Sequence, residues 1–157
     1  MSDEFTTQSA QEYLAAKLAE ETRLQEEKRN QEAAVALAPA VWKKVRDAAT
    51  AKCEEWNKVT GEQTLSCKET VMGDLRIWCP ERALQMTVHY DSRKLLITIK
   101  NAGRLLNETD VILRIAGYSR GESHDARLMR NEEIINMDML LLGELRVLTG
   151  IGRKAGT

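Results

Sequence analysis

The side chains best suited to chemistry in this sequence are its histidines, its cysteines and one short run of neighbouring polar residues. His89 and His124 are the two histidines, and neither has a histidine four residues away, the spacing by which one helix presents two metal ligands. Ser123, His124 and Asp125 are the residue types of a hydrolytic triad, but triads are assembled from segments that lie far apart in the chain. We therefore expect both histidines at the surface and predict no catalytic residue, no metal site and no cofactor.

The three cysteines, Cys53, Cys67 and Cys79, show no C-x-x-C spacing and so do not resemble a zinc site. A turn at residues 72–74 would place Cys67 opposite Cys79 on neighbouring strands, within reach of a disulfide. The chain begins with acidic residues and no apolar leader, which favours a cytoplasmic location. In that reducing compartment we expect two reduced thiols rather than a bond.

Several basic residues lie in the C-terminal quarter of the chain. Arg120, Arg127, Arg130, Arg153 and Lys154 form a candidate basic patch near the end of the last helix, suited either to solvent or to an anionic head group or phosphopeptide. The chain has three Trp, three Tyr and one Phe, and they do not alternate with basic residues along a strand, so we predict no nucleic acid partner. No glycine-rich run has the spacing of a phosphate-binding loop.

A β-hairpin over residues 83–100 is the clearest structural signal. Apolar residues alternate with polar ones from Leu84 to Tyr90 and again from Leu95 to Ile99, the period of a half-buried strand. Pairing Asp91 with Lys94 places Val88 opposite Ile97 and gathers the apolar residues on one face.

Further strands are predicted at residues 65–71, 75–79 and 111–117, with a longer connection at 101–110 and a polar loop at 119–125. Asn131 is the predicted N-cap of a closing helix that runs to Thr149 with a broad apolar face.

Two helices are predicted before the sheet. Residues 9–37 contain neither Gly nor Pro and are rich in helix formers, but their apolar stripe is short and consists of Ala10, Tyr13, Leu14 and Leu18. Pro39 is suited to the first position of a second helix, which carries Trp42 and Trp56 on its apolar side.

The fold class predicted is therefore α+β, with about five antiparallel strands in a meander. A preceding Trp-containing helix and a C-terminal helix cover it. The expected organisation is a helical arm at 1–37, an α+β domain at 38–150 and a flexible tail at 151–157.

No run of 18 apolar residues is present, so no transmembrane segment is predicted. Residues 1–75 hold 10 Lys/Arg against 14 Asp/Glu, and residues 76–157 hold 13 against 10. This difference indicates a Glu-rich helical front end; the alternative is charge complementarity between the two halves, within or between chains.

These features favour a non-enzymatic module for protein–protein association, most simply a homodimer. The arm either projects into solvent or docks on a second subunit through Tyr13, Leu14 and Leu18, and Arg120, Arg127 and Arg130 are a second candidate group. The alternative is a small-molecule or lipid-binding domain, in which the helices roof a cavity over the apolar face of the hairpin.

Overall fold

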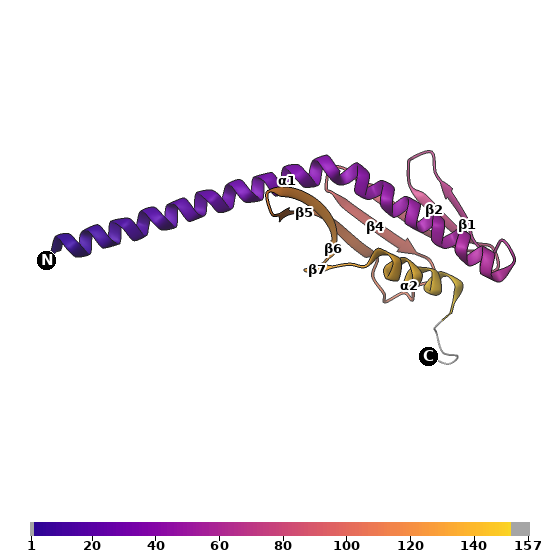
Figure 1. Ribbon diagram of the computed structural model, residues 1–157. Coiled ribbons are helices and arrows are strands. Elements are labelled where there is room, and N and C mark those ends of the chain that lie inside the picture. The colour runs from indigo at the N-terminus through magenta and orange to yellow at the C-terminus, as the bar shows by residue number, and fades with distance from the viewer. Residues whose placement is uncertain (1, 152–157) are drawn as a thin grey trace.

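The computed structural model describes residues 2–151, which form one long helix, a sheet and a second helix (Figure 1). The helices are α1 (Ser2–Thr60) and α2 (Met137–Thr149), and the strands are β1 (Ser66–Glu69), β2 (Leu75–Cys79), β3 (Leu84–Asp91), β4 (Leu96–Asn101), β5 (Val111–Arg120), β6 (Ser123–Arg130) and β7 (Glu133–Ile134). The strands form one antiparallel sheet in chain order. The α+β class and the meander are confirmed, with seven strands where the sequence predicted about five.

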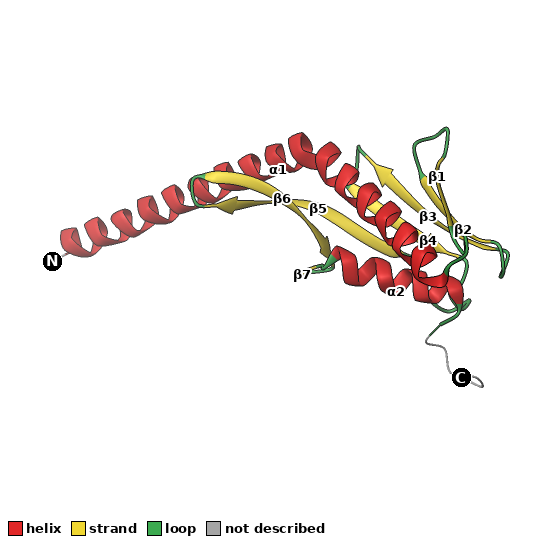
Figure 2. Ribbon diagram, turned by 45° about the vertical axis from the view of Figure 1, so that its right-hand side comes forward, coloured by secondary structure: helices red, strands yellow, loops and turns green. Residues whose placement is uncertain are grey.

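Both helices cover the same face of the sheet, its inner face (Figure 2). The alternation of apolar and polar residues gives the sheet one apolar face for the helices to cover. In β2, for example, Ile77 is buried on the inner face, whereas its neighbours Arg76 and Trp78 are exposed on the other face. On α1 the ring of Trp42 stacks on Tyr90 of β3, with 5.6 Å between ring centroids. The predicted cover of the sheet by the Trp-containing helix and the closing helix is confirmed.

α1 is one continuous helix, so the prediction of two helices separated before Pro39 is wrong. A proline inside a helix removes the hydrogen bond to the carbonyl four residues earlier, here that of Val35. Val35 and Pro39 lie on the exposed side of α1, where water can replace that bond. Ala34 and Ala38 are buried against the sheet, and this packing holds the helix together across the proline. No helix within residues 2–151 is long and apolar enough to cross a membrane.

The hairpin of β3 and β4 has the predicted faces but a different register. Val88 lies opposite Ile99, whereas the sequence pattern predicts that it lies opposite Ile97. The loop is longer than expected, because Asp91 accepts two backbone hydrogen bonds inside it and Leu95 adopts a φ of 55°. A shift of two residues keeps every side chain on its face, which is why the pattern alone could not detect it.

The sheet also continues further toward the C-terminus than predicted. β5 extends to Arg120 and returns as β6, where the sequence analysis expected a polar loop over residues 119–125. Asn131, the predicted helix N-cap, lies in the turn after β6 with a φ of 57°. The N-cap of α2 is Asn136, whose side chain accepts a hydrogen bond from the amide of Met139 at 3.2 Å.

The predicted strand register that places Cys67 opposite Cys79 is wrong. Cys67 of β1 lies opposite Ile77, and Cys79 of β2 lies opposite Leu84 of β3. The turn between β1 and β2 is longer than expected and includes Val71, which is fully exposed instead of extending the strand.

A buried polar cluster fixes α2 to the sheet. Glu144 of α2 is only 2% exposed and forms an ion pair with Arg104 from the loop after β4. The side-chain amide of Asn101 donates to the Glu144 backbone carbonyl at 2.8 Å and to its carboxylate at 3.2 Å. The loop approaches α2 closely at Gly103, where a Cβ atom would lie 2.3 Å from the carbonyl oxygen of Val147.

Candidate functional site: the arm and the outer face of the sheet

The first part of α1 projects beyond the sheet (Figure 1). Every residue from 3 to 25 is exposed, and we call this segment the arm. Tyr13, Leu14 and Leu18 are 66%, 61% and 64% exposed, and with Ala10 they lie on one side of the helix at its 3.6-residue period. We call these four residues the apolar stripe. The structure therefore brings three of the predicted interaction residues together on one exposed surface.

The arm is negatively charged overall. Its acidic residues are Asp3, Glu4, Glu12, Glu20 and Glu21, and its basic residues are Lys17 and Arg23. Arg23 forms ion pairs with Glu20 and, beyond the arm, with Glu27. The hydrogen bond from Arg23 lowers the pKa of Glu20 below its usual value. Such exposed pairs contribute little to the stability of a helix.

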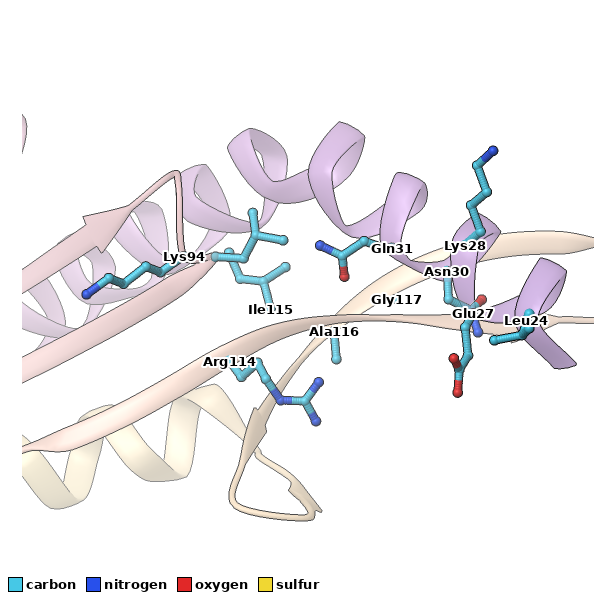
Figure 3. Close-up of a pocket in the computed structure, with 11 residues that line it drawn as sticks. Leu24, Glu27, Lys28, Asn30, Gln31, Lys94, Arg114, Ile115, Ala116 and Gly117 are labelled. Carbon is cyan, nitrogen blue, oxygen red and sulfur yellow. The ribbon is translucent and has the colours of Figure 1, made fainter.

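The arm is joined to the sheet by a contact between α1 and the hairpin of β5 and β6, which we call the clasp (Asn30, Gly117, Ser119 and His124). The Asn30 Oδ1 atom lies 2.9 Å from His124 Nδ1 and 3.3 Å from Ser119 Oγ. Glu26 lies 3.9 Å from the same histidine nitrogen. Figure 3 shows Asn30 and Gly117 where the helix passes over β5. The clasp fixes the direction in which the arm leaves the sheet.

The residue types of a triad on β6 do not form one. Successive residues of a strand face opposite sides, so His124 faces α1 while Ser123 and Asp125 face away. The Ser123 hydroxyl donates to the carbonyl of Arg120 at 2.8 Å, and Asp125 lies 3.4 Å from the hydroxyl of Tyr118. His124 is half-buried, contrary to the surface position expected for it.

A row of cations crosses the outer face of the sheet, the face that carries no helix. Lys68 lies opposite Arg76, Arg76 opposite Thr87, and Thr87 opposite Lys100, so the row runs from β1 to β4. We call Lys68, Arg76 and Lys100 the cationic row. All three are exposed, and none forms an ion pair with another residue between 2 and 151. Because like charges on neighbouring strands repel, the row gains stability from an external anion.

The surroundings of the cationic row add another cation and apolar surface. Trp78 of β2 is 36% exposed and Ile112 of β5 is 54% exposed on this face. Arg114 points away from α1, whereas its neighbour Ile115 points toward α1 (Figure 3). The carboxylate of Asp91, at the end of β3, accepts backbone hydrogen bonds in the following loop, which lowers its pKa.

His89 also lies on the outer face. It is exposed, as predicted, and its Nδ1 atom lies 2.6 Å from Asp74. Asp74, which precedes β2 on that face, forms no ion pair with the cationic row within residues 2–151.

The predicted group of arginines is dispersed. Arg120 ends β5 at the tip of the hairpin and Arg130 ends β6 at the opposite end, about 23 Å away at 3.3 Å per residue. Arg127 lies between them with its guanidinium 4.3 Å from the ring centroid of Tyr118. Arg153 and Lys154 lie outside the described residues.

Two cysteine thiols meet between α1 and β1. The thiol of the buried Cys53 interacts with that of the half-buried Cys67, whose sulfur also lies 3.7 Å from the hydroxyl of Thr50. The interaction with Cys53 and then the contact with Thr50 lower the pKa of Cys67 to about 7. The same contact, with burial, raises the pKa of Cys53. The pair was not predicted from the sequence, because it joins two elements of different type.

The interior of the fold is filled with side chains. Met86, Val88 and Ile97, which were expected to lie beneath a ligand cavity, are fully buried in the core. An apolar surface pocket of about 300 Å³ lies instead between the end of α1 and α2, where Trp56 and Leu142 line it.

Residues 2–151 contain no cluster of His, Cys, Asp and Glu that could hold a metal ion. No known protein family, curated protein or solved structure matches this chain.

Proposed function

We propose that this protein is a non-enzymatic association module that forms a homodimer through its arm. The observation that supports this proposal is the continuous exposure of residues 3–25, with the apolar stripe at their centre. A helix that is polar on most of its surface and packs on nothing contributes no core to its own fold. Its apolar side chains are therefore available to another chain.

The arm is also held in a fixed direction. Asn30 and Gly117 lock α1 onto β5, and the helix continues without a break from there into the arm. A segment that is ordered before binding loses less conformational entropy on association than a flexible tail does. The clasp therefore supports binding without itself belonging to the interface.

The energetics favour a reciprocal arrangement. Burying one large apolar side chain contributes roughly 1.5–3 kcal/mol, whereas association costs about 4–15 kcal/mol in lost freedom of motion. One apolar stripe alone therefore gives weak binding. Two arms, each docked on the other copy, double the buried surface and close the assembly as a dimer.

The test is the association constant of full-length chains, measured by sedimentation. Leu14→Gln with Leu18→Gln removes the centre of the apolar stripe, and we expect the dimer Kd to rise at least about tenfold, a loss of about 1.4 kcal/mol. The matched control is Ala19→Gln, which lies on the opposite side of the helix from Ala10 and should leave Kd unchanged. A wild-type chain that stays monomeric at about 100 μM, where even weak dimers form, or equal effects of the two variants, would refute the proposal.

A further inference from the structure

The outer face of the sheet is charged and uncovered, and the arm has the opposite charge. The cationic row of Lys68, Arg76 and Lys100 has no carboxylate partner within residues 2–151, and Arg114 adds a further cation on β5. We propose that this face is the receptor for the arm of a second copy, which crosses it as an acidic helix with its apolar stripe toward the sheet. This inference rests on the proposed arm-mediated dimer and names the surface that the arm contacts.

The geometry of α1 excludes the same contact within one chain. From residue 30 onward α1 packs on the inner face, and Ala34, Ala38 and Trp42 are buried there. The arm continues the same helix, so it leaves on the inner-face side and points away from the sheet (Figure 1, Figure 2). Reaching its own outer face would require α1 to break at the clasp. The acidic arm can therefore meet the cationic row only on another molecule.

The dimensions of the two surfaces match. The arm has residues 3–25, and at 1.5 Å per residue it is about 34 Å long. The strands from β1 to β5 are spaced by about 4.8 Å, so the outer face across these five strands is about 19 Å wide. One arm is thus long enough to cross the strands from β1 to β5.

The chemistry of the two surfaces matches as well. Glu21 lies three residues after Leu18 and seven after Leu14, so a carboxylate occupies the same side of the helix as the apolar stripe. On the sheet, the exposed Trp78 and Ile112 provide apolar surface beside the cationic row. A helix that presents leucines together with a carboxylate on one side can therefore contact the apolar side chains and the cations of the outer face at the same time.

A single-stranded nucleic acid is the competing occupant, since it also carries regularly spaced anions. Proteins that bind it combine cations with several aromatic side chains on which bases stack. On the outer face of β1–β5, Trp78 is the exposed aromatic residue, and Tyr118 of β5 is covered by the guanidinium of Arg127. The acidic arm therefore fits this face better than bases do.

Charge reversal on full-length chains tests the inference. Arg76→Glu reverses the centre of the cationic row, and Glu21→Lys reverses the charge beside the apolar stripe. Each variant alone should raise the dimer Kd about tenfold at low salt, because like charges then face each other. The chain that carries both substitutions should recover most of the loss, because the opposite charges are restored in exchanged positions.

Matched controls carry the same charge changes away from the interface. Glu12→Lys lies on the side of the arm opposite Leu14, and Arg93→Glu lies in the loop after β3, so both should dimerise like the wild type. Far-UV circular dichroism and the melting temperature of every variant show whether the fold is intact, and the combined variant provides the decisive comparison if one single variant is poorly folded.

The possible outcomes separate this inference from the proposed function. If the apolar-stripe variant weakens the dimer but Arg76→Glu does not, or if the combined variant fails to recover, the arm docks elsewhere and the inference is wrong while the arm-mediated dimer stands. If a fluorescent oligothymidine binds the wild type and Glu21→Lys equally and Arg76→Glu less, the face is a nucleic acid site and the inference is also wrong. A monomeric wild type refutes both.

Discussion

Gly117 of β5 lies directly beneath the backbone of Asn30 of α1. A Cβ atom at position 117 would fall 1.7 Å from the Asn30 carbonyl oxygen, far inside any real contact distance. The helix can pass this close to the strand only because residue 117 has no side chain. The direction of the arm therefore depends on one glycine in a strand that is remote from it in sequence.

Gly117→Ala should lower the free energy of unfolding by about 1–3 kcal/mol, the range for forcing an extra methyl group into a packed site. The contact is with backbone, which cannot rotate aside as a side chain can. Urea denaturation measures the loss. Gly143→Ala is the matched control, since nothing lies within 4 Å of its added Cβ, and alanine in a helix is more stable than glycine by about 0.5–1 kcal/mol. Equal destabilisation by both variants would contradict the close contact.

Truncation of the helix should separate two parts of α1. Removing residues 1–25 deletes, within the described positions 3–25, exposed residues only, and we expect the melting temperature to change by less than about 2 °C. Removing residues 1–37 also deletes Asn30 and the buried Ala34, which leaves part of the inner face uncovered. The longer deletion should melt several degrees lower. Indistinguishable melting of the two truncated chains would show that the clasp contributes nothing to stability.

The buried ion pair of Arg104 and Glu144 gives a third prediction. Arg104→Met leaves the carboxylate of Glu144 buried without its partner and should cost about 3–5 kcal/mol. Adding Glu144→Met removes that charge, so the double variant should be more stable than Arg104→Met alone. Urea denaturation of the three chains completes the comparison, and a double variant that is less stable than the single one would contradict it.

Cys67 should be the reactive cysteine. Its pKa is lowered to about 7, so the thiolate forms as the pH rises through that value and the rate of alkylation by iodoacetamide should level off just above it. Cys53→Ala removes the first cause of the shift and should move the plateau to higher pH, and Cys67→Ser should remove the fast phase. Mass spectrometry after timed alkylation locates the modified residue. A wild-type plateau that begins only near pH 9 would rule out the thiol contact.

The sequence predicted the faces of the central strands because burial follows a period of two, as Val88 and Ile99 illustrate. It did not predict their register, since a shift of two residues leaves that period unchanged. β6 was missed because its inner side carries His124 and Ala126, which contact a helix rather than fill the centre of the core. Its polar composition therefore resembles that of a loop.

The candidate site was predicted in part. The apolar stripe was found because Tyr13, Leu14 and Leu18 lie close together in the sequence. The cationic row could not be found in that way, because Lys68 and Lys100 are brought together only by the register of four strands. The sequence pattern around Pro39 also led to the wrong prediction of a new helix there. The helix is continuous through the proline because its buried side packs on the sheet, and this tertiary contact cannot be read from the local sequence.

The placement of α1 on β5 and β6 has a consequence for synthesis on the ribosome. The helix is translated first, yet the strands that it contacts most end at Arg120 and Arg130. About 70 residues separate Thr60 from Arg130, which at 5–20 residues per second takes on the order of 10 s. Until β5 and β6 have been synthesised, the part of α1 that packs on them lacks its cover. The nascent chain therefore exposes part of the buried side of an amphipathic helix during that interval, and this surface is open to a ribosome-associated chaperone.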